Sequence, residues 1–416
     1  MPRSTEPARP IVLHAARLLD VVSGELREPG VIVVEGNRIA AIGPDQLPED
    51  AVVHDLGDVT LLPGLMDMEV NLIMGGADYG LLAGVQDDTA TRVLRGVANA
   101  KRTLRAGFTT VRNLGLFVQT NGVLLDVALG KAIDLGWIDG PRVIPAGHAI
   151  TPTGGHLEPT MFQALAPGVL PLTVQEGVAD GVPEVRKAVR YQIKYGARVI
   201  KISASGGVMS HSGLAGAQQY SDEELAAIAD EAHRAGLKVA AHAHGDAGIR
   251  ACIRAGVDCI EHGSLASDDT IQMMVDHGTF LVPTSYLSEG LDISRAAPEL
   301  QAKAAEVFPR ARAMLGKAIA AGVKIACGTD APAIPHGDNA KELWAMVDRG
   351  MTPMQALQAA TVMSAELIDV DDRGRLAPGL LADIIAVPGD PSTDITVTQD
   401  VRFVMKGGRI YKGGDV

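Results

Sequence analysis

Short apolar segments alternate with amphipathic helical segments through most of this chain, and this alternation restricts its possible folds more than any other feature. It runs from about Gly64 to about Ala377. Such a pattern is typical of repeated βα units built on a parallel sheet. Because eight such units close a barrel, we expect an α/β fold with a (β/α)8 TIM barrel over residues 63–377.

The most regular units lie in the middle of the chain. Ser221 and Glu224 have the capping-box spacing that begins a helix, and Gly236 is placed to end it. The strand LKVAAHAHG follows, and after a second helix comes the strand VDCIEHGS. These strands should therefore be neighbours in the barrel.

The two chain ends differ from the middle in composition. Residues 10–62 form short β-rich runs separated by Gly, Asn and Asp, and LADIIAVPG and VRFVMKGGRIYKGG near the other end have the same character. A chain of 416 residues exceeds what one hydrophobic core usually accommodates. We expect residues 1–62 and 378–416 to form one small β-sandwich beside the barrel.

The charge and cysteine content limit the partners and the compartment. A net charge of -13 disfavours binding to nucleic acid or to an anionic membrane surface, since both are polyanions, so a small-molecule partner is favoured. The three cysteines lie in apolar runs, which suits reduced thiols. No window holds the roughly 20 apolar residues of a membrane span, and the first residues lack a secretory apolar stretch. These features predict a cytoplasmic protein.

A lysine interrupts one predicted strand, ARVIKIS. Burying an ammonium group is costly unless it is paired, so Lys201 needs an explanation. It either forms a buried ion pair or has reacted with carbon dioxide to give a carbamate that ligates metal. The histidines on the next strands favour the carbamate.

Histidines stand at the ends of the two strands that follow. His242 and His262 lie on successive strands, and neutral imidazole is a preferred zinc ligand. A lone strand histidine is usually a core residue, but two on adjacent strands favour a metal site. The side chain of His244 should point in the same direction as that of His242. We nevertheless expect His244 just beyond the strand end, where it contacts the metal ligands rather than the metal.

Asp330, in GTDAP, closes the last predicted barrel strand. A carboxylate there is placed to move a proton from water to a leaving nitrogen. The alternative is an aspartate that caps a turn. Its position on a barrel strand favours the catalytic role.

Several motifs together resemble the amidohydrolase superfamily almost from end to end. They are LLPGLMDM, GFTTVRNLG, ITPTGGH, KVAAHAHG, IEHGS, GTDAP and LAPGLLADIIAVPGDP. They look like the branch with imidazolonepropionase and the prolyl and arginyl dipeptidases. The resemblance implies a barrel flanked by a β-sandwich, a carbamylated Lys201, metal ligands His242 and His262, and a catalytic Asp330.

The first-strand metal motif departs from this family. Members usually carry His-x-His after LLPGLxDx, whereas this chain has Glu69 and Asn71 there. Asn71 offers only a neutral amide oxygen, a poor ligand for a transition metal, so we expect one divalent metal, by preference Zn²⁺. Glu69 and Asn71 should instead bind substrate or support the site, and Glu69 close to Asp330 should raise one carboxyl pKa.

Two further residues are weaker candidates. His156, in PTGGH, matches a position that reaches the substrate in this branch, and a plain loop histidine is equally consistent with it. Tyr220 follows a glycine-rich loop and has a hydroxyl suited to an oxyanion. His211, in the same loop, is expected to face solvent.

These observations leave three functions open. The altered first-strand motif is similar to that of phenylurea hydrolases, which favours an N-aryl urea hydrolase with one metal. The alternatives are an Xaa-Pro or Xaa-Arg type dipeptidase or cyclic-amide hydrolase, and a non-catalytic descendant that only binds ligand. A dipeptidase needs a cation for the substrate carboxylate, which the sequence alone does not locate. By resemblance, the chain should form a homo-oligomer.

Overall fold

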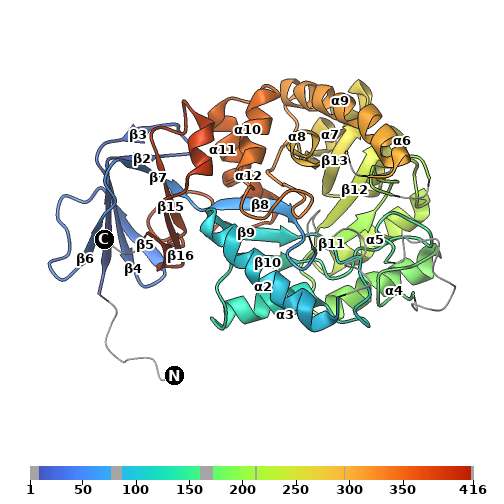
Figure 1. Ribbon diagram of the computed structural model, residues 1–416, viewed down its shortest axis with the longest axis horizontal. Coiled ribbons are helices and arrows are strands. Elements are labelled where there is room, and N and C mark those ends of the chain that lie inside the picture. Colours follow the sequence, from blue (N-terminus) through green and yellow to red (C-terminus); the bar gives the residue numbers. More distant parts are fainter. Residues whose placement is uncertain (1–8, 76–86, 160–171, 211–212, 295, 414–416) are drawn as a thin grey trace.

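The predicted architecture is confirmed. The computed structural model describes residues 9–75, 87–159, 172–210, 213–294 and 296–413. Figure 1 shows a barrel of strands and helices with a β-rich unit at one end. Strands from both ends of the chain make up that unit.

Parallel strands wall the barrel in sequence order. They are β8 (Leu65–Val70), β9 (Phe108–Asn113), β10 (Arg142–Pro145), β11 (Ile200–Ser203), β12 (Val239–Gly245), β13 (Cys259–Leu265) and β14 (Phe280–Val282). Ile150 bridges Ile202 and so joins the β10 side to β11. The segment 325–331 takes the eighth place, because Ile325 bridges Leu281 and Ala331 bridges Val70. The barrel is therefore closed.

Helices between these strands cover the barrel. They are α2 (Thr89–Arg105), α3 (Leu125–Asp134), α4 (Gly181–Lys194), α5 (Asp222–Arg234), α6 (Asp246–Ala255), α7 (Asp268–His277), α8 (Leu287–Gly290), α9 (Pro298–Ala321), α10 (Lys341–Asp348), α11 (Pro353–Ala359) and α12 (Val362–Leu367). The predicted capping box of α5 is present, with Ser221 accepting from the Glu224 backbone and Glu224 accepting from that of Ser221. The alternation of strand and helix places each strand's carboxyl end at the same mouth of the barrel.

The β-sandwich contains two sheets. The first sheet comprises, in spatial order, β5 (Arg38–Ile42), β4 (Gly30–Glu35), β1 (Ile11–Ala15) and β6 (Val52–Asp55). The second sheet comprises, in spatial order, β17 (Arg409–Lys412), β16 (Phe403–Lys406), β15 (Ile384–Pro388), β7 (Val59–Pro63), β2 (Arg17–Leu19) and β3 (Leu26–Arg27). The 3-10 helix η2 (Ile395–Gln399) lies between β15 and β16 in the sequence. Antiparallel pairing of β7 with β15 joins the two chain ends. A separate apolar core that includes Leu13, Ile32 and Phe403 fills the space between the sheets.

Two observations concern the predicted reduced thiols and the predicted absence of a membrane span. Cys252, Cys259 and Cys327 are buried and not disulfide-bonded. Among the described residues, every helix is too short or too polar to cross a membrane.

Candidate active site and metal centre

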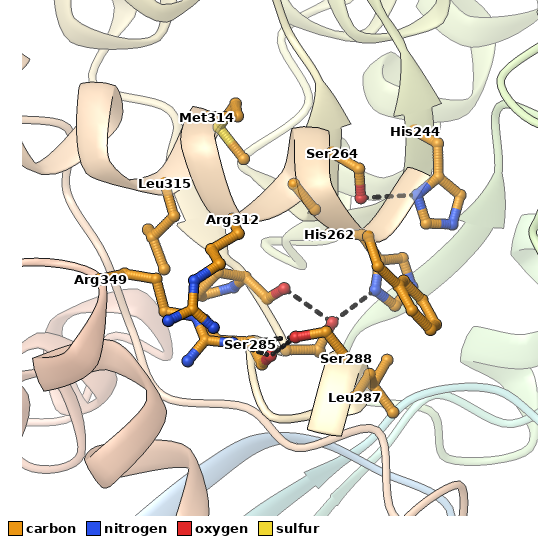
Figure 2. A pocket seen from close by; sticks show the side chains of 14 residues that line it. His244, His262, Ser264, Ser285, Leu287, Ser288, Arg312, Met314, Leu315 and Arg349 are labelled. Atoms are coloured by element: carbon orange, nitrogen blue, oxygen red, sulfur yellow. Dashed lines mark hydrogen bonds between the residues drawn. The ribbon is translucent and has the colours of Figure 1, made fainter. Parts of the chain in front are cut away.

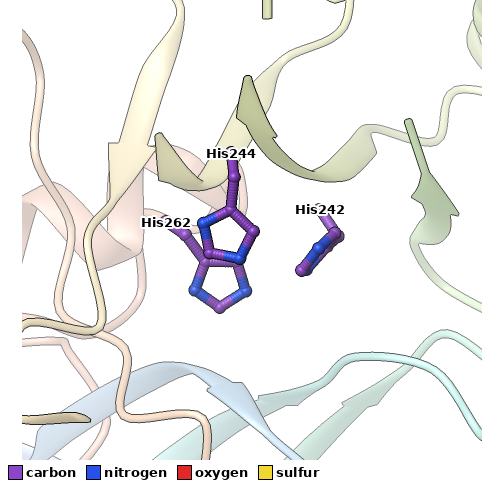
Figure 3. A group of neighbouring side chains, drawn as sticks. All are labelled: His242, His244 and His262. Carbon is purple, nitrogen blue, oxygen red and sulfur yellow. The ribbon is translucent and has the colours of Figure 1, made fainter. Parts of the chain in front are cut away.

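Three imidazole rings meet at the barrel mouth. His242 and His244 come from β12, and His262 comes from β13. One possible ligand atom from each ring lies within 4.8 Å of those of the other two, and all three residues are buried. Figure 3 shows the rings of His244 and His262 facing each other, with His242 beside them.

Hydroxyl groups fix the orientation of two of these rings. Ser264 Oγ lies 2.8 Å from His244 Nδ1, and Thr284 Oγ1 lies 2.7 Å from His262 Nδ1. Thr284 Oγ1 also donates to the carbonyl of Pro283, so it accepts from His262. The His262 ring, held through Nδ1–H, therefore presents the Nε2 lone pair, as metal-binding histidines do. His242 Nε2 is buried and has no hydrogen-bond partner.

Burial also keeps these imidazoles uncharged. It lowers the pKa of His242, His244 and His262 well below the ordinary value, with a smaller contribution from neighbouring positive groups. Neutral imidazole is the form that ligates a divalent metal.

Lys201 forms a buried ion pair. Its Nζ donates to Glu69 Oε1 at 3.0 Å, and both side chains are almost completely buried. This is the ion pair that the sequence left open as the alternative to a carbamate. Glu69 Oε1 lies 3.8 Å from His262 Nε2, which brings β8, β11 and β13 together at one point.

Asp330 lies at the same mouth, in a left-handed backbone conformation with φ of 57°. Its backbone N–H donates to the Glu69 carbonyl at 2.7 Å. Burial, and next the charge of Glu69, raise the pKa of the Asp330 carboxyl well above its usual range. The expected effect of Glu69 on a neighbouring carboxyl is therefore confirmed for Asp330.

His156 packs directly on the cluster. Its ring centroid is 4.1 Å from that of His242, and Ser210 Oγ lies 2.6 Å from its Nδ1. Ser210 Oγ also accepts from the Gly207 N–H, which holds the hydroxyl beside the His156 ring. Burial lowers the pKa of His156 to about 3, so the ring is neutral.

The structure does not bring Tyr220 to the histidines. The Tyr220 side chain is buried in the helix-facing core, and its hydroxyl donates to the Ala179 carbonyl at 3.0 Å. A hydroxyl committed to a backbone carbonyl is not free to stabilise an oxyanion, so this expectation is corrected for the conformation described. His211 lies outside the described residues.

The first strand supplies a mixed set of side chains. Asp67 accepts from Thr329 and Asn339, so it braces the wall of the barrel. Asn71 is buried, and its Oδ1 has no hydrogen-bond partner. Glu69 Oε2 is likewise buried without a partner. Asn71 and Glu69 thus leave unpaired oxygens where the family motif has histidines.

Sequence reasoning missed a second buried ion pair. Arg112 of β9 donates to Glu261 of β13 at 2.8 Å, and also to the Met68 carbonyl of β8. Burial raises the pKa of Glu261 to about 7, opposed by the charge of Arg112. The only hint in the sequence was a charged residue inside each of two apolar strands.

These residues fit a bound divalent metal. The buried, unpartnered His242 Nε2 and the anchored rings of His244 and His262 form a nitrogen-rich cluster, which suits zinc. A buried polar atom without a partner is unfavourable, and a ligated ion removes that cost.

The sequence agrees with this geometry. Residues 60–411 match the Amidohydrolase family. The chain belongs to the amidohydrolase family. In this family, as in other enzymes with this barrel, the mouth that holds the histidines is where the active site is built.

Two named proteins are similar to this chain over almost its whole length. The chain is 35% identical to an ochratoxinase of Aspergillus niger, over 99% of this chain and 88% of the relative. A solved Xaa-Pro dipeptidase with methionine bound in its active site is 37% identical, with a TM-score of 0.88, and covers 97% of this chain and 100% of its own. The predicted membership of the dipeptidase-like branch is confirmed.

The similarity to phenylurea hydrolases is more distant. Phenylurea hydrolase B shares 22% identity and a TM-score of 0.75, over 96% of both chains. At this identity the likeness shows a common fold only. The expected N-aryl urea substrate is therefore supported less well than its dipeptidase alternative.

Proposed function

We propose that this amidohydrolase cleaves the amide bond of a small dipeptide-like substrate at the histidine cluster. The observation that carries the proposal is the cluster of His242, His244 and His262 at the barrel mouth of an amidohydrolase. Asp330 lies at the same mouth, where its backbone N–H bonds to the Glu69 carbonyl. Similarity to an Xaa-Pro dipeptidase and to an ochratoxinase supports an amide rather than an aryl urea.

Each side chain has a task that follows from its surroundings. A divalent metal, by preference Zn²⁺, supplies Lewis acidity and makes water a stronger acid when it is bound. Asp330 accepts a proton from the attacking water and passes it to the leaving nitrogen. His156, a neutral imidazole beside the cluster, donates a ring N–H to the substrate carbonyl and stabilises its developing negative charge.

A pocket beside the cluster contains two arginines, the type of side chain that a dipeptidase needs for the substrate carboxylate. Its lining includes His244, His262, Leu287, Arg312 and Arg349. Figure 2 shows the two arginines on one side of the pocket and the histidines on the other. Arg349 is buried, and both Glu289 oxygens accept from it, whereas the Arg312 side chain is 48% exposed. Arg312 itself pairs with Glu289 at 2.8 Å and with Asp348, so it binds a substrate carboxylate by exchanging these partners, which its exposure to solvent allows.

We expect Arg312→Gln to raise the KM for a free dipeptide by about tenfold, because a hydrogen bond between charged groups contributes roughly 1.5–3 kcal/mol and solvent screens part of it here. The KM for the same dipeptide amidated at its carboxyl end should change little. Arg310→Gln, on the exposed side of the same helix, is the matched control. An equal effect on both substrates would remove Arg312 from carboxylate binding.

A substrate panel tests the proposed function itself. Purified zinc-loaded protein is given Xaa-Pro and Xaa-Arg dipeptides, N-acyl amino acids, cyclic amides and phenylureas, and the release of amino acid or of aniline is measured. The proposal expects amino acid release. Preferential release of aniline would support the phenylurea alternative, and turnover of no substrate by a protein that binds zinc would support a ligand-binding descendant.

A further inference from the structure

Glu342 is a buried carboxyl group that the proposed chemistry does not use. It lies in the first turn of α10 and is fully buried. Its two oxygens accept from the backbone N–H groups of Ser285 and Tyr286, each at 2.7 Å. Burial raises the pKa of Glu342 to about 8, and these two N–H donors oppose the rise, so they favour the carboxylate form. Glu342 is therefore tied to the turn that follows β14, residues 283–288.

Two more contacts from the region of α10 reach the same turn. Arg349, which caps the end of α10, donates to the Ser285 carbonyl at 3.1 Å and to Ser288 Oγ at 2.8 Å. The Trp344 ring packs edge-on against the Tyr286 ring, with 6.2 Å between the ring centroids. These contacts and those of Glu342 hold both the backbone and the side chains of the turn.

The turn needs such support because its backbone is strained. Thr284 has a left-handed φ of 49°, which is unfavourable for a β-branched residue. Within the turn, the Leu287 N–H bonds to the Thr284 carbonyl at 3.3 Å, a long hydrogen bond. A strained conformation persists only where its surroundings impose it, and it is common at ligand sites. Glu342 bonds the two residues that follow Thr284, so it is placed to impose this conformation.

The turn is one wall of the pocket beside the histidines. Thr284 and Leu287 of the turn line it, and so do Phe308 and Met314 of α9 (Figure 2). In the proposed reaction the leaving amino acid carries the free carboxylate, and Arg312 of this pocket is the proposed partner of that carboxylate. The side chain of the leaving amino acid therefore lies in the same pocket, between the turn and the apolar residues of α9.

We propose that Glu342 is a positioning residue, which holds the turn 283–288 in the shape that receives the side chain of the leaving amino acid. The inference rests on the proposed function, since it needs a dipeptide-like substrate in this pocket. The side-chain hydrogen bonds described for Glu342 go to the turn. A displaced wall weakens the binding of substrate and transition state alike, which raises KM and leaves kcat nearly unchanged.

Glu342→Gln tests this role in zinc-loaded protein. Glutamine keeps the size of the side chain, but its amide NH₂ faces one of the two backbone N–H groups, so one hydrogen bond is lost. Glu342→Asp keeps both acceptor oxygens on a shorter side chain. The matched control is Glu366→Gln, which makes the same change in an exposed pair with Lys324.

Three dipeptides separate a role in the pocket wall from a general effect on the fold. Alanyl-leucine and alanyl-proline have a leaving residue with an apolar side chain, whereas the glycine of alanyl-glycine has no side chain to reach the turn. The measurements are kcat and KM, or the inhibition constant of a dipeptide that is not hydrolysed. Zinc per chain and circular dichroism are determined on the same preparations.

We expect Glu342→Gln to raise KM for alanyl-leucine and alanyl-proline by about tenfold, because a hydrogen bond to a charged group is lost, while kcat changes by less than about threefold. KM for alanyl-glycine should change by less than about threefold, since only uniform binding of the side chain is affected. Glu342→Asp should show the same selectivity with a smaller rise, and Glu366→Gln should behave as the wild type does.

Unchanged KM values, an equal rise for all three dipeptides, a fall in kcat alone, or loss of zinc from the folded variant would overturn the inference and leave the proposed hydrolase intact. If Glu342→Gln does not fold, the selectivity of Glu342→Asp decides in the same way. A wild type that neither hydrolyses nor binds any of the three dipeptides would overturn the proposed function, and this inference with it.

Discussion

Asp330→Asn should lower kcat for a dipeptide by roughly 10²- to 10⁴-fold, the range that a positioned acid or base contributes to catalysis. Asparagine keeps the size of the side chain but cannot carry a proton between water and the leaving nitrogen. It also tolerates the left-handed φ of 57° at this position, and the backbone bond to the Glu69 carbonyl is unchanged. The loss should therefore come from chemistry rather than from unfolding.

Steady-state kinetics and zinc analysis of the same preparation check this expectation. Zinc content should equal that of the wild type, because the substitution leaves the histidine cluster unchanged. Asp338→Asn is the matched control, since Asp338 follows in the same connection and pairs only with Lys341 among the contacts described here. Normal turnover by Asp330→Asn would show that another group moves the proton.

The fold was predictable because its signal is local and repeated. Apolar strands and capped helices, such as the helix between Ser221 and Gly236, alternate many times along the chain. One ambiguous segment therefore does not change the prediction of a (β/α)8 barrel. The eighth strand shows the limit of this reasoning. Its segment, near Ile325, is held by isolated bridges rather than by a regular ladder, a detail that depends on its neighbours and not on its own residues.

The site residues could be predicted from the sequence only where the end of a strand could be located. His242 and His262 follow from the pattern, but β12 runs on to Gly245 and has an irregular register near Ala243, which keeps His244 within the barrel mouth. Alternation along β13 would also place Glu261 and His262 on opposite faces. The left-handed φ of 69° at His262 breaks that alternation. No sequence pattern predicts that a histidine adopts this backbone conformation.

The Arg112–Glu261 pair was missed because each partner is one charge inside an apolar strand, and only the folded barrel brings the two together.

The pair should contribute strongly to the stability of the barrel. Arg112 contacts β13 through Glu261 and β8 through the Met68 carbonyl, and its side chain is only 2% exposed. Removing one partner leaves the other charge buried and unpaired, which typically costs about 3–5 kcal/mol.

We therefore expect Arg112→Met to lower the free energy of unfolding by about 3–5 kcal/mol, and Glu261→Gln to do so by a comparable amount, because the guanidinium then loses its counter-charge. The double variant Arg112→Met with Glu261→Leu should be less destabilised than the sum of its parts, since no buried charge is left alone. Urea denaturation followed by circular dichroism measures all of them, and Arg254→Ala, which breaks an exposed pair with Asp222, should change little. Additive effects in the double variant would mean that the two side chains stabilise the barrel through packing and not through their charges.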